Sequence, residues 1–214
     1  MIFAAVASRL VLGAALAWQV AIAGAAPEIP LAWRAAAGLV AIAALTRLWW
    51  GLVLAGALAP AAAFFVPFPA RGVEVIAWAC LSAWLLSVWR PLAPGGWPRA
   101  VAVPAVLYGA ALITSWLRIA VSGASGIPPV ALPSYLFHAN SADYLVYSSS
   151  DAETWTLLHS LTGLGVFLAA AGIAGHEQGA RFRRAVAMAL AIIGATLGAA
   201  TLLEIAREWS ANGN

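Results

Sequence analysis

The chain contains no lysine and few acidic residues, so charged side chains make up only 9% of its 214 residues. Soluble globular domains carry roughly a quarter charged residues, and the low value therefore excludes an ordinary soluble domain. The single cysteine, Cys80, excludes a disulfide or a thiolate metal site within the chain. The sequence also lacks G-x-G-x-x-G, P-loop, CxxC and HExxH motifs, which removes the usual signals for nucleotide, thiol-redox and zinc chemistry.

Apolar residues dominate instead, at 64% of the chain. Windows of about 20 apolar residues match the thickness of a bilayer core. We find seven, at 8–26, 31–48, 49–67, 73–90, 100–120, 154–174 and 184–206. Only TRLWW separates the second window from the third, so merging them would leave six. The sequence therefore predicts an all-α, polytopic transmembrane helical bundle in which residues 1–214 form a single transmembrane domain.

The arginines predict the orientation of this bundle. Placing the N-terminus in the cytoplasm puts seven of the 11 basic residues on that side and four outside. The cytoplasmic set is Arg9, Arg47, Arg90, Arg99, Arg181, Arg183 and Arg184, and the external set is Arg34, Arg71, Arg118 and Arg207. We interpret the net charge of +3 as topology arginines beside lipid headgroups, not as a nucleic-acid surface.

The longest polar stretch, 122–152, contains no arginine and is predicted to be external. It carries His138, Asp143 and Asp151, and a long connection of this kind is a common place for function. Aromatic and polar residues are mixed within it, which is typical either of a loop or of a short helix lying on the membrane surface.

Ionisable residues at membrane depth indicate candidate functional residues. His138 in the external stretch and His159 just inside the sixth window are the candidate catalytic residues for proton transfer. Glu153 lies six residues before His159, so the two fall on roughly opposite faces of one helix and direct contact is not expected. The histidine positions suit neither haem nor a three-ligand zinc site. We therefore predict no metal and no cofactor.

The external arginines indicate a phosphate-bearing substrate. A guanidinium group binds phosphate through two parallel hydrogen bonds, so Arg118, Arg71 and Arg34 are candidate phosphate-binding residues for a lipid-linked substrate. The alternative is that they contact ordinary lipid headgroups. Glu74 is three residues after Arg71, and this pair is interpreted either as an ion pair anchoring a helix end or as a proton relay.

Three segments carry a resemblance to a known family: LAPAAAFFVPFPARGVEVIAWACLSAWLLSVWRP, VLYGAALITSWLRIAVSG and ETWTLLHSLTGLGVFLAAAGIAG. Together they resemble the N-terminal half of bacterial O-antigen ligase/polymerase-type integral membrane proteins. The resemblance implies a multi-pass protein of the bacterial inner membrane. It also implies transfer of a glycan from an undecaprenyl-pyrophosphate carrier at the outer face, without metal or nucleotide.

The chain departs from that family in its length. Family members are about twice as long, and the essential Arg and His lie in a large external loop of the second half. The resemblance therefore implies a truncated or split member that lacks those residues.

A second function fits the same sequence, namely a non-catalytic polytopic subunit or scaffold of a larger membrane complex. The scarcity of buried polar residues, the many small residues and the absence of motifs favour it. A transporter fits less well, because almost no charge falls in the middle of a window. The expected partners are membrane lipids, a lipid-linked glycan and a partner membrane subunit, with no nucleic acid.

Overall fold

The computed structural model describes residues 2–25, 27, 29–66, 69–93, 96–122, 149–174 and 179–212. These residues form seven helices and no strand. The helices are α1 (Ile2–Ala25), α2 (Leu31–Thr46), α3 (Leu48–Phe65), α4 (Pro69–Leu86), α5 (Arg99–Ser122), α7 (Ser149–Ala174) and α8 (Gly179–Asn212). Each predicted apolar window coincides with one helix, so the predicted all-α class is confirmed.

Within the described residues, four helices are long and apolar enough to cross a membrane. They are Ala4–Ala25, Arg99–Arg118, Leu157–Ala174 and Gly179–Arg207. The three shorter apolar helices are Leu31–Thr46, Leu48–Ala62 and Gly72–Leu86. A helix bonds most of its backbone amides and carbonyls internally, as an apolar surrounding requires, and Pro60 in α3 and Pro104 in α5 interrupt that pattern. This is the composition of a helical membrane protein; the number of crossings and the cytoplasmic N-terminus remain predictions.

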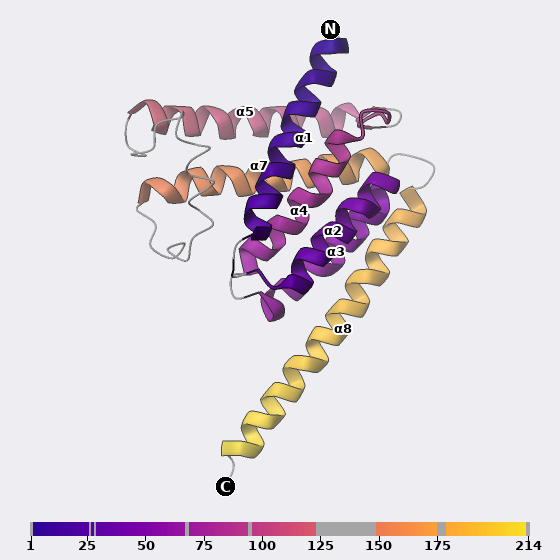
Figure 1. Ribbon diagram of the computed structural model, residues 1–214, viewed down its shortest axis with the longest axis vertical. Coiled ribbons are helices and arrows are strands. Elements are labelled where there is room, and N and C mark those ends of the chain that lie inside the picture. The colour runs from indigo at the N-terminus through magenta and orange to yellow at the C-terminus, as the bar shows by residue number, and fades with distance from the viewer. Residues whose placement is uncertain are drawn as a thin grey trace.

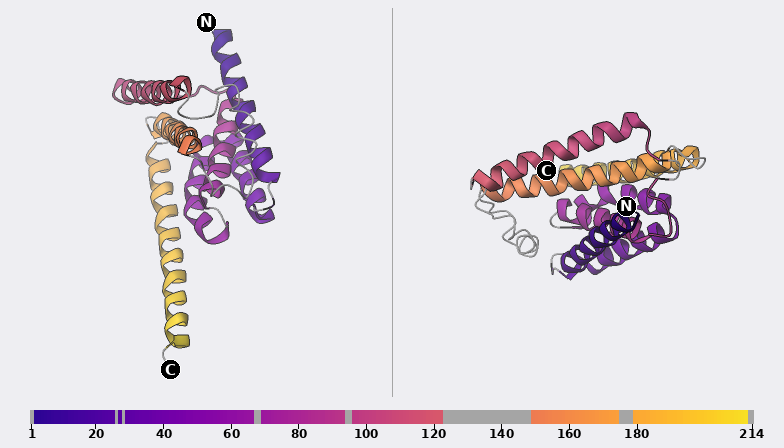
Figure 2. Two further views of the ribbon diagram at one scale, coloured as in Figure 1. Left: turned by 90° about the vertical axis from the view of Figure 1, so that its left-hand side faces the viewer. Right: turned by 90° about the horizontal axis from the view of Figure 1, so that it is seen from above.

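Helix α4 is the centre of the molecule. It packs against α1, α2, α3 and α7, and its residues Val75, Ile76, Cys80 and Ala83 are buried in the core. Cys80 therefore acts as a small packing residue. Helices α5 and α7 lie side by side and cross the other helices, whereas α8 contacts α3 and α7 and then extends away from the bundle (Figures 1 and 2).

The turn between α2 and α3 is one residue long. Arg47 adopts an extended conformation there, with φ −151° and ψ 115°. The second and third predicted windows are therefore two separate helices. Trp33 lies near the start of the window at 31–48, and this position predicts an interfacial anchor. In the structure the side chain of Trp33 is buried, and its indole Nε1 donates a hydrogen bond of 2.9 Å to the carbonyl of Gly72.

The stretch predicted to be external, 122–152, has helical residues at both of its ends. Helix α5 continues to Ser122 and α7 already begins at Ser149, so residues 149–152 belong to a helix. The prediction of an external loop or surface helix, and of His138 within it, otherwise falls on residues 123–148, which lie outside the described residues.

Glycine at position 51 is required by the close approach of α2 and α3. A Cβ atom on Gly51 would lie 2.5 Å from the Cβ of Ala44 and 2.8 Å from its Cα. We expect Gly51→Ala to lower the free energy of unfolding by about 2 kcal/mol, because backbone atoms must move apart. The matched variant is Gly56→Ala in the same helix, where a Cβ meets nothing within 4 Å.

Thermal unfolding of both purified proteins in detergent measures this difference. Gly56→Ala is expected to leave the melting temperature unchanged or to raise it, since alanine favours a helix. Equal melting temperatures for the two variants would contradict the close approach.

Candidate functional site

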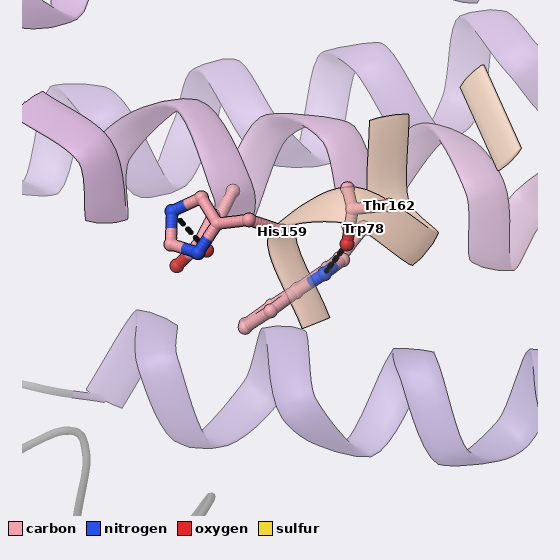
Figure 3. Close-up of polar contacts among 4 residues, drawn as sticks. Trp78, His159 and Thr162 are labelled. Atoms are coloured by element: carbon pink, nitrogen blue, oxygen red, sulfur yellow. Dashed lines mark hydrogen bonds and ion pairs between the residues drawn. The ribbon is translucent and has the colours of Figure 1, made fainter. Parts of the chain in front are cut away.

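The candidate site is centred on Glu74, a carboxylate carried by the central helix α4. Its side chain is 4% exposed. His159 of α7 lies opposite, and its Nε2 is 2.9 Å from Oε1 of Glu74 (Figure 3). A buried carboxylate is costly to desolvate unless a donor pairs with it. The contact of α4 with α7 therefore joins two ionisable residues far apart in the sequence.

A second polar contact lies one helical turn further along both helices. The indole Nε1 of Trp78 donates a hydrogen bond of 3.0 Å to Oγ1 of Thr162 (Figure 3). Trp78 follows Glu74 by four residues on α4, and Thr162 follows His159 by three on α7, so each pair shares one helix face. The two contacts fix the register between the helices, and this register holds the imidazole at the carboxylate.

The Glu74–His159 pair lines a cavity of about 440 Å³ between α3, α4 and α7. This volume is within the range of small-molecule sites, roughly 300–1,000 Å³. Small and apolar residues form most of the wall, including Ala55, Gly56 and Ala77. The imidazole is 38% exposed and so is accessible, while the carboxylate behind it is covered.

This arrangement suits acid–base chemistry. Nε2 of His159 faces Oε1 of Glu74 at 2.9 Å, and a proton held between these two atoms leaves the lone pair of a neutral imidazole on Nδ1. A carboxylate that orients an imidazole in this way also stabilises the imidazolium that forms when the ring accepts a proton. The pair therefore places an imidazole base beside a buried carboxylate at the wall of an apolar cavity.

Of the other predicted site residues, Arg34 and Arg118 are not among the described lining residues of this cavity. No arginine is among its described lining residues. Nε of Arg34 donates to the carbonyl of Ile29, at 3.0 Å, and Arg118 is exposed near the end of α5. Arg71 lies in α4, but its side chain is not among the described ones, so its pairing with Glu74 and its role in phosphate binding remain predictions.

Sequence reasoning named His159 and Glu74 separately and did not pair them. The sequence does contain a pattern at these positions. Glu74 and Trp78 are four residues apart on α4, His159 and Thr162 are three apart on α7, and each pair lies on an otherwise apolar helix face. Which two helices meet could not be deduced from that pattern. The spacing of Glu153 and His159 predicts no direct contact between them, and the side chain of Glu153 is outside those described.

Metal binding has no support in the described residues, where no three His, Cys, Asp or Glu side chains cluster. Comparisons of the chain with protein-family models, with curated proteins and with solved structures find no match. The resemblance to O-antigen ligase/polymerase-type proteins thus stays a prediction.

Proposed function

We propose that this chain forms the membrane part of an enzyme that transfers a glycan from an undecaprenyl-pyrophosphate carrier to an acceptor hydroxyl, at the outer face of the bacterial inner membrane. The observation that carries the proposal is the Glu74–His159 pair at an apolar cavity. Ionisable pairs at membrane depth are expensive and by default functional. Both residues also belong to segments that resemble the glycan ligases and polymerases, but the essential Arg and His of that family lie in its second half, so the roles of Glu74 and His159 rest on the geometry of the pair.

In the proposed reaction His159 is the general base and Glu74 is its positioning residue. Nδ1 of His159 accepts the proton of the acceptor hydroxyl, and the acceptor oxygen forms a bond to the anomeric carbon of the sugar. The bond from that carbon to the phosphate oxygen breaks, and the lipid pyrophosphate leaves with the electron pair. The imidazolium then returns its proton to water or to the leaving group.

The pyrophosphate needs cationic partners beyond the cavity lining. Arg71 is three residues before Glu74 on α4 and is our first candidate for this contact. Arg118 and Arg34 remain candidates for the parts of the donor that extend outside the cavity. His138 retains its proposed place in the external stretch, as a second group able to exchange protons with water.

Filling the cavity tests whether the reaction takes place there. Gly56 lines the cavity, and a Cβ on it meets nothing within 4 Å. We expect Gly56→Leu to fold and to lower transfer from undecaprenyl-pyrophosphate-linked glycan in membranes by at least about tenfold, because the side chain occupies the substrate volume. Gly38→Leu is the matched control, since Gly38 is equally open but lies on α2, away from the cavity.

The second candidate function is the non-catalytic polytopic subunit. It is favoured by α8, where none of the apolar window within Gly179–Arg207 is buried, so the helix offers an uncovered surface to lipid or to a partner subunit. Transfer by Gly56→Leu within twofold of the unmodified protein would contradict the enzyme and favour the subunit.

A further inference from the structure

A second cavity, of about 390 Å³, lies at the other end of α4 from Glu74. Its walls come from the α2–α3 turn, the end of α4 and the segment that follows α4. Arg47 and Arg90 line it together with Trp49 and Trp84, and no acidic residue is among its described lining residues. The charged groups on the walls are therefore all positive.

Two indole N–H groups at this cavity have no hydrogen-bond acceptor. Trp84 is only 7% exposed, and Nε1 of Trp84 and Nε1 of Trp49 are both buried without a partner. Buried donors of this kind are rare in folded proteins, because leaving one unsatisfied forfeits its hydrogen bonds to water. An indole N–H can only donate, so what these two groups need is an oxygen that accepts.

The end of α2, with Ala44 and Thr46, and the start of α3 both line this cavity, so helix ends of opposite polarity meet there. Helix α3 begins at Leu48, no side chain caps its first amides, and Leu48 and Trp49 line the cavity. The start of a helix carries partial positive charge and binds anions. The opposite charge at the end of α4 is already compensated, because Arg9 donates to the carbonyls of Ser87 and Arg90.

We propose that this cavity binds a phosphate group through Arg47 and Arg90, and that the indole rings of Trp49 and Trp84, whose Nε1 atoms are covered, turn to donate to its oxygens. Guanidinium groups and neutral N–H donors around one oxyanion are the chemistry of phosphate recognition. The phosphate belongs either to the headgroup of an anionic lipid or to a free phosphate ion. The proposal is independent of glycan transfer, since it uses none of the residues around Glu74 and His159.

Native mass spectrometry of the purified protein in detergent measures the binding. The probes are phosphatidylglycerol, diacylglycerol as the phosphate-free lipid, and inorganic phosphate. The double variant Arg47→Gln/Arg90→Gln is expected to weaken binding of the phosphate-bearing probe by about 10–100-fold, because it removes two charge-assisted contacts. Trp84→Phe keeps the aromatic packing and removes one donor, and is expected to weaken binding by about fivefold.

Arg99→Gln is the matched control, because Arg99 is an exposed arginine that does not line the cavity. Its binding is expected to equal that of the unmodified protein. Loss of phosphatidylglycerol binding in the variants identifies the lipid headgroup as the source, and loss of inorganic phosphate binding identifies the free ion.

Three results would overturn the proposal. The first is no binding of either phosphate probe by the unmodified protein, and the second is equal binding of diacylglycerol and phosphatidylglycerol. The third is normal binding by Trp84→Phe when the arginine variant has lost it, since this would mean attraction to surface charge without a built cavity.

Discussion

Replacement of His159 with alanine is expected to lower the rate of glycan transfer by about 10²–10⁴-fold, the usual contribution of a general base. Glu74→Gln is expected to reduce the rate by a comparable amount, because the amide loses the charge that stabilises the imidazolium and fixes its tautomer. Membranes containing each variant, supplied with undecaprenyl-pyrophosphate-linked glycan, provide the measurement.

The two residues are expected to act as one unit. The double variant Glu74→Gln/His159→Ala should therefore be no slower than the slower single variant, because removing the base leaves the carboxylate nothing to orient. Added imidazole is expected to restore part of the rate to His159→Ala alone, a result that a structural role would not produce.

Thr114→Val is the control for this series. The hydroxyl of Thr114 on α5 donates to the carbonyl of Ala110 at 2.7 Å, and Thr114 is not among the described lining residues of the cavity. The transfer rate of Thr114→Val is expected to stay within a few-fold of the unmodified protein. A rate for His159→Ala within twofold of the unmodified protein would exclude the proposed base.

Arg9→Met is expected to lower the free energy of unfolding by about 3 kcal/mol, the largest stability effect that we predict. The guanidinium of Arg9 donates to three carbonyls at the end of α4, those of Arg90 at 2.7 Å, Trp84 at 2.9 Å and Ser87 at 2.7 Å. Carbonyls at a helix end have no partner within the helix. Methionine fills similar space but removes the donor of all three, and only the carbonyl of Ser87 keeps another one, the N–H of Arg90 at 3.0 Å.

Two further variants separate the hydrogen bonds from the charge. Arg9→Lys keeps the charge, yet a single ammonium group has the wrong geometry to replace the guanidinium fork, so an intermediate loss is expected. Arg99→Met removes an exposed arginine and should leave the melting temperature in detergent unchanged. A loss for Arg99→Met as large as that for Arg9→Met would show that total charge, not the contacts of Arg9, sets the stability.

Arg9 also illustrates what sequence reasoning misses. On its own the residue is a topology arginine, and nothing in its neighbourhood marks it as a cap for a helix more than 70 residues away. The same holds for Trp33, which its position marks as interfacial but which is buried against Gly72. Both side chains donate to a backbone carbonyl. Because every residue has a backbone carbonyl, the sequence does not indicate which one accepts the hydrogen bond.

The sequence predicted the two residues of the candidate site but not the contact between them. His159 and Glu74 are unusual enough in apolar helices to be recognised one by one. Their pairing depends on α4 and α7 being neighbours with a particular register, and the polar spacing on each helix does not specify either. The cavity at Arg47 and Arg90 was not predicted, because it depends on which helix ends meet. From the sequence alone these two residues are only positive charges on one side of a membrane.

The sequence by itself determined that the chain is helical and apolar and where each helix lies, because hydrophobicity and backbone hydrogen bonding are properties of contiguous segments. Only the tertiary structure decided that α4 is central and that Glu74 meets His159. It also decided that two arginines and two indoles surround one cavity. Those outcomes depend on side-chain packing between helices. Apolar helices rich in alanine and leucine are so alike in composition that many arrangements of them pack comparably well.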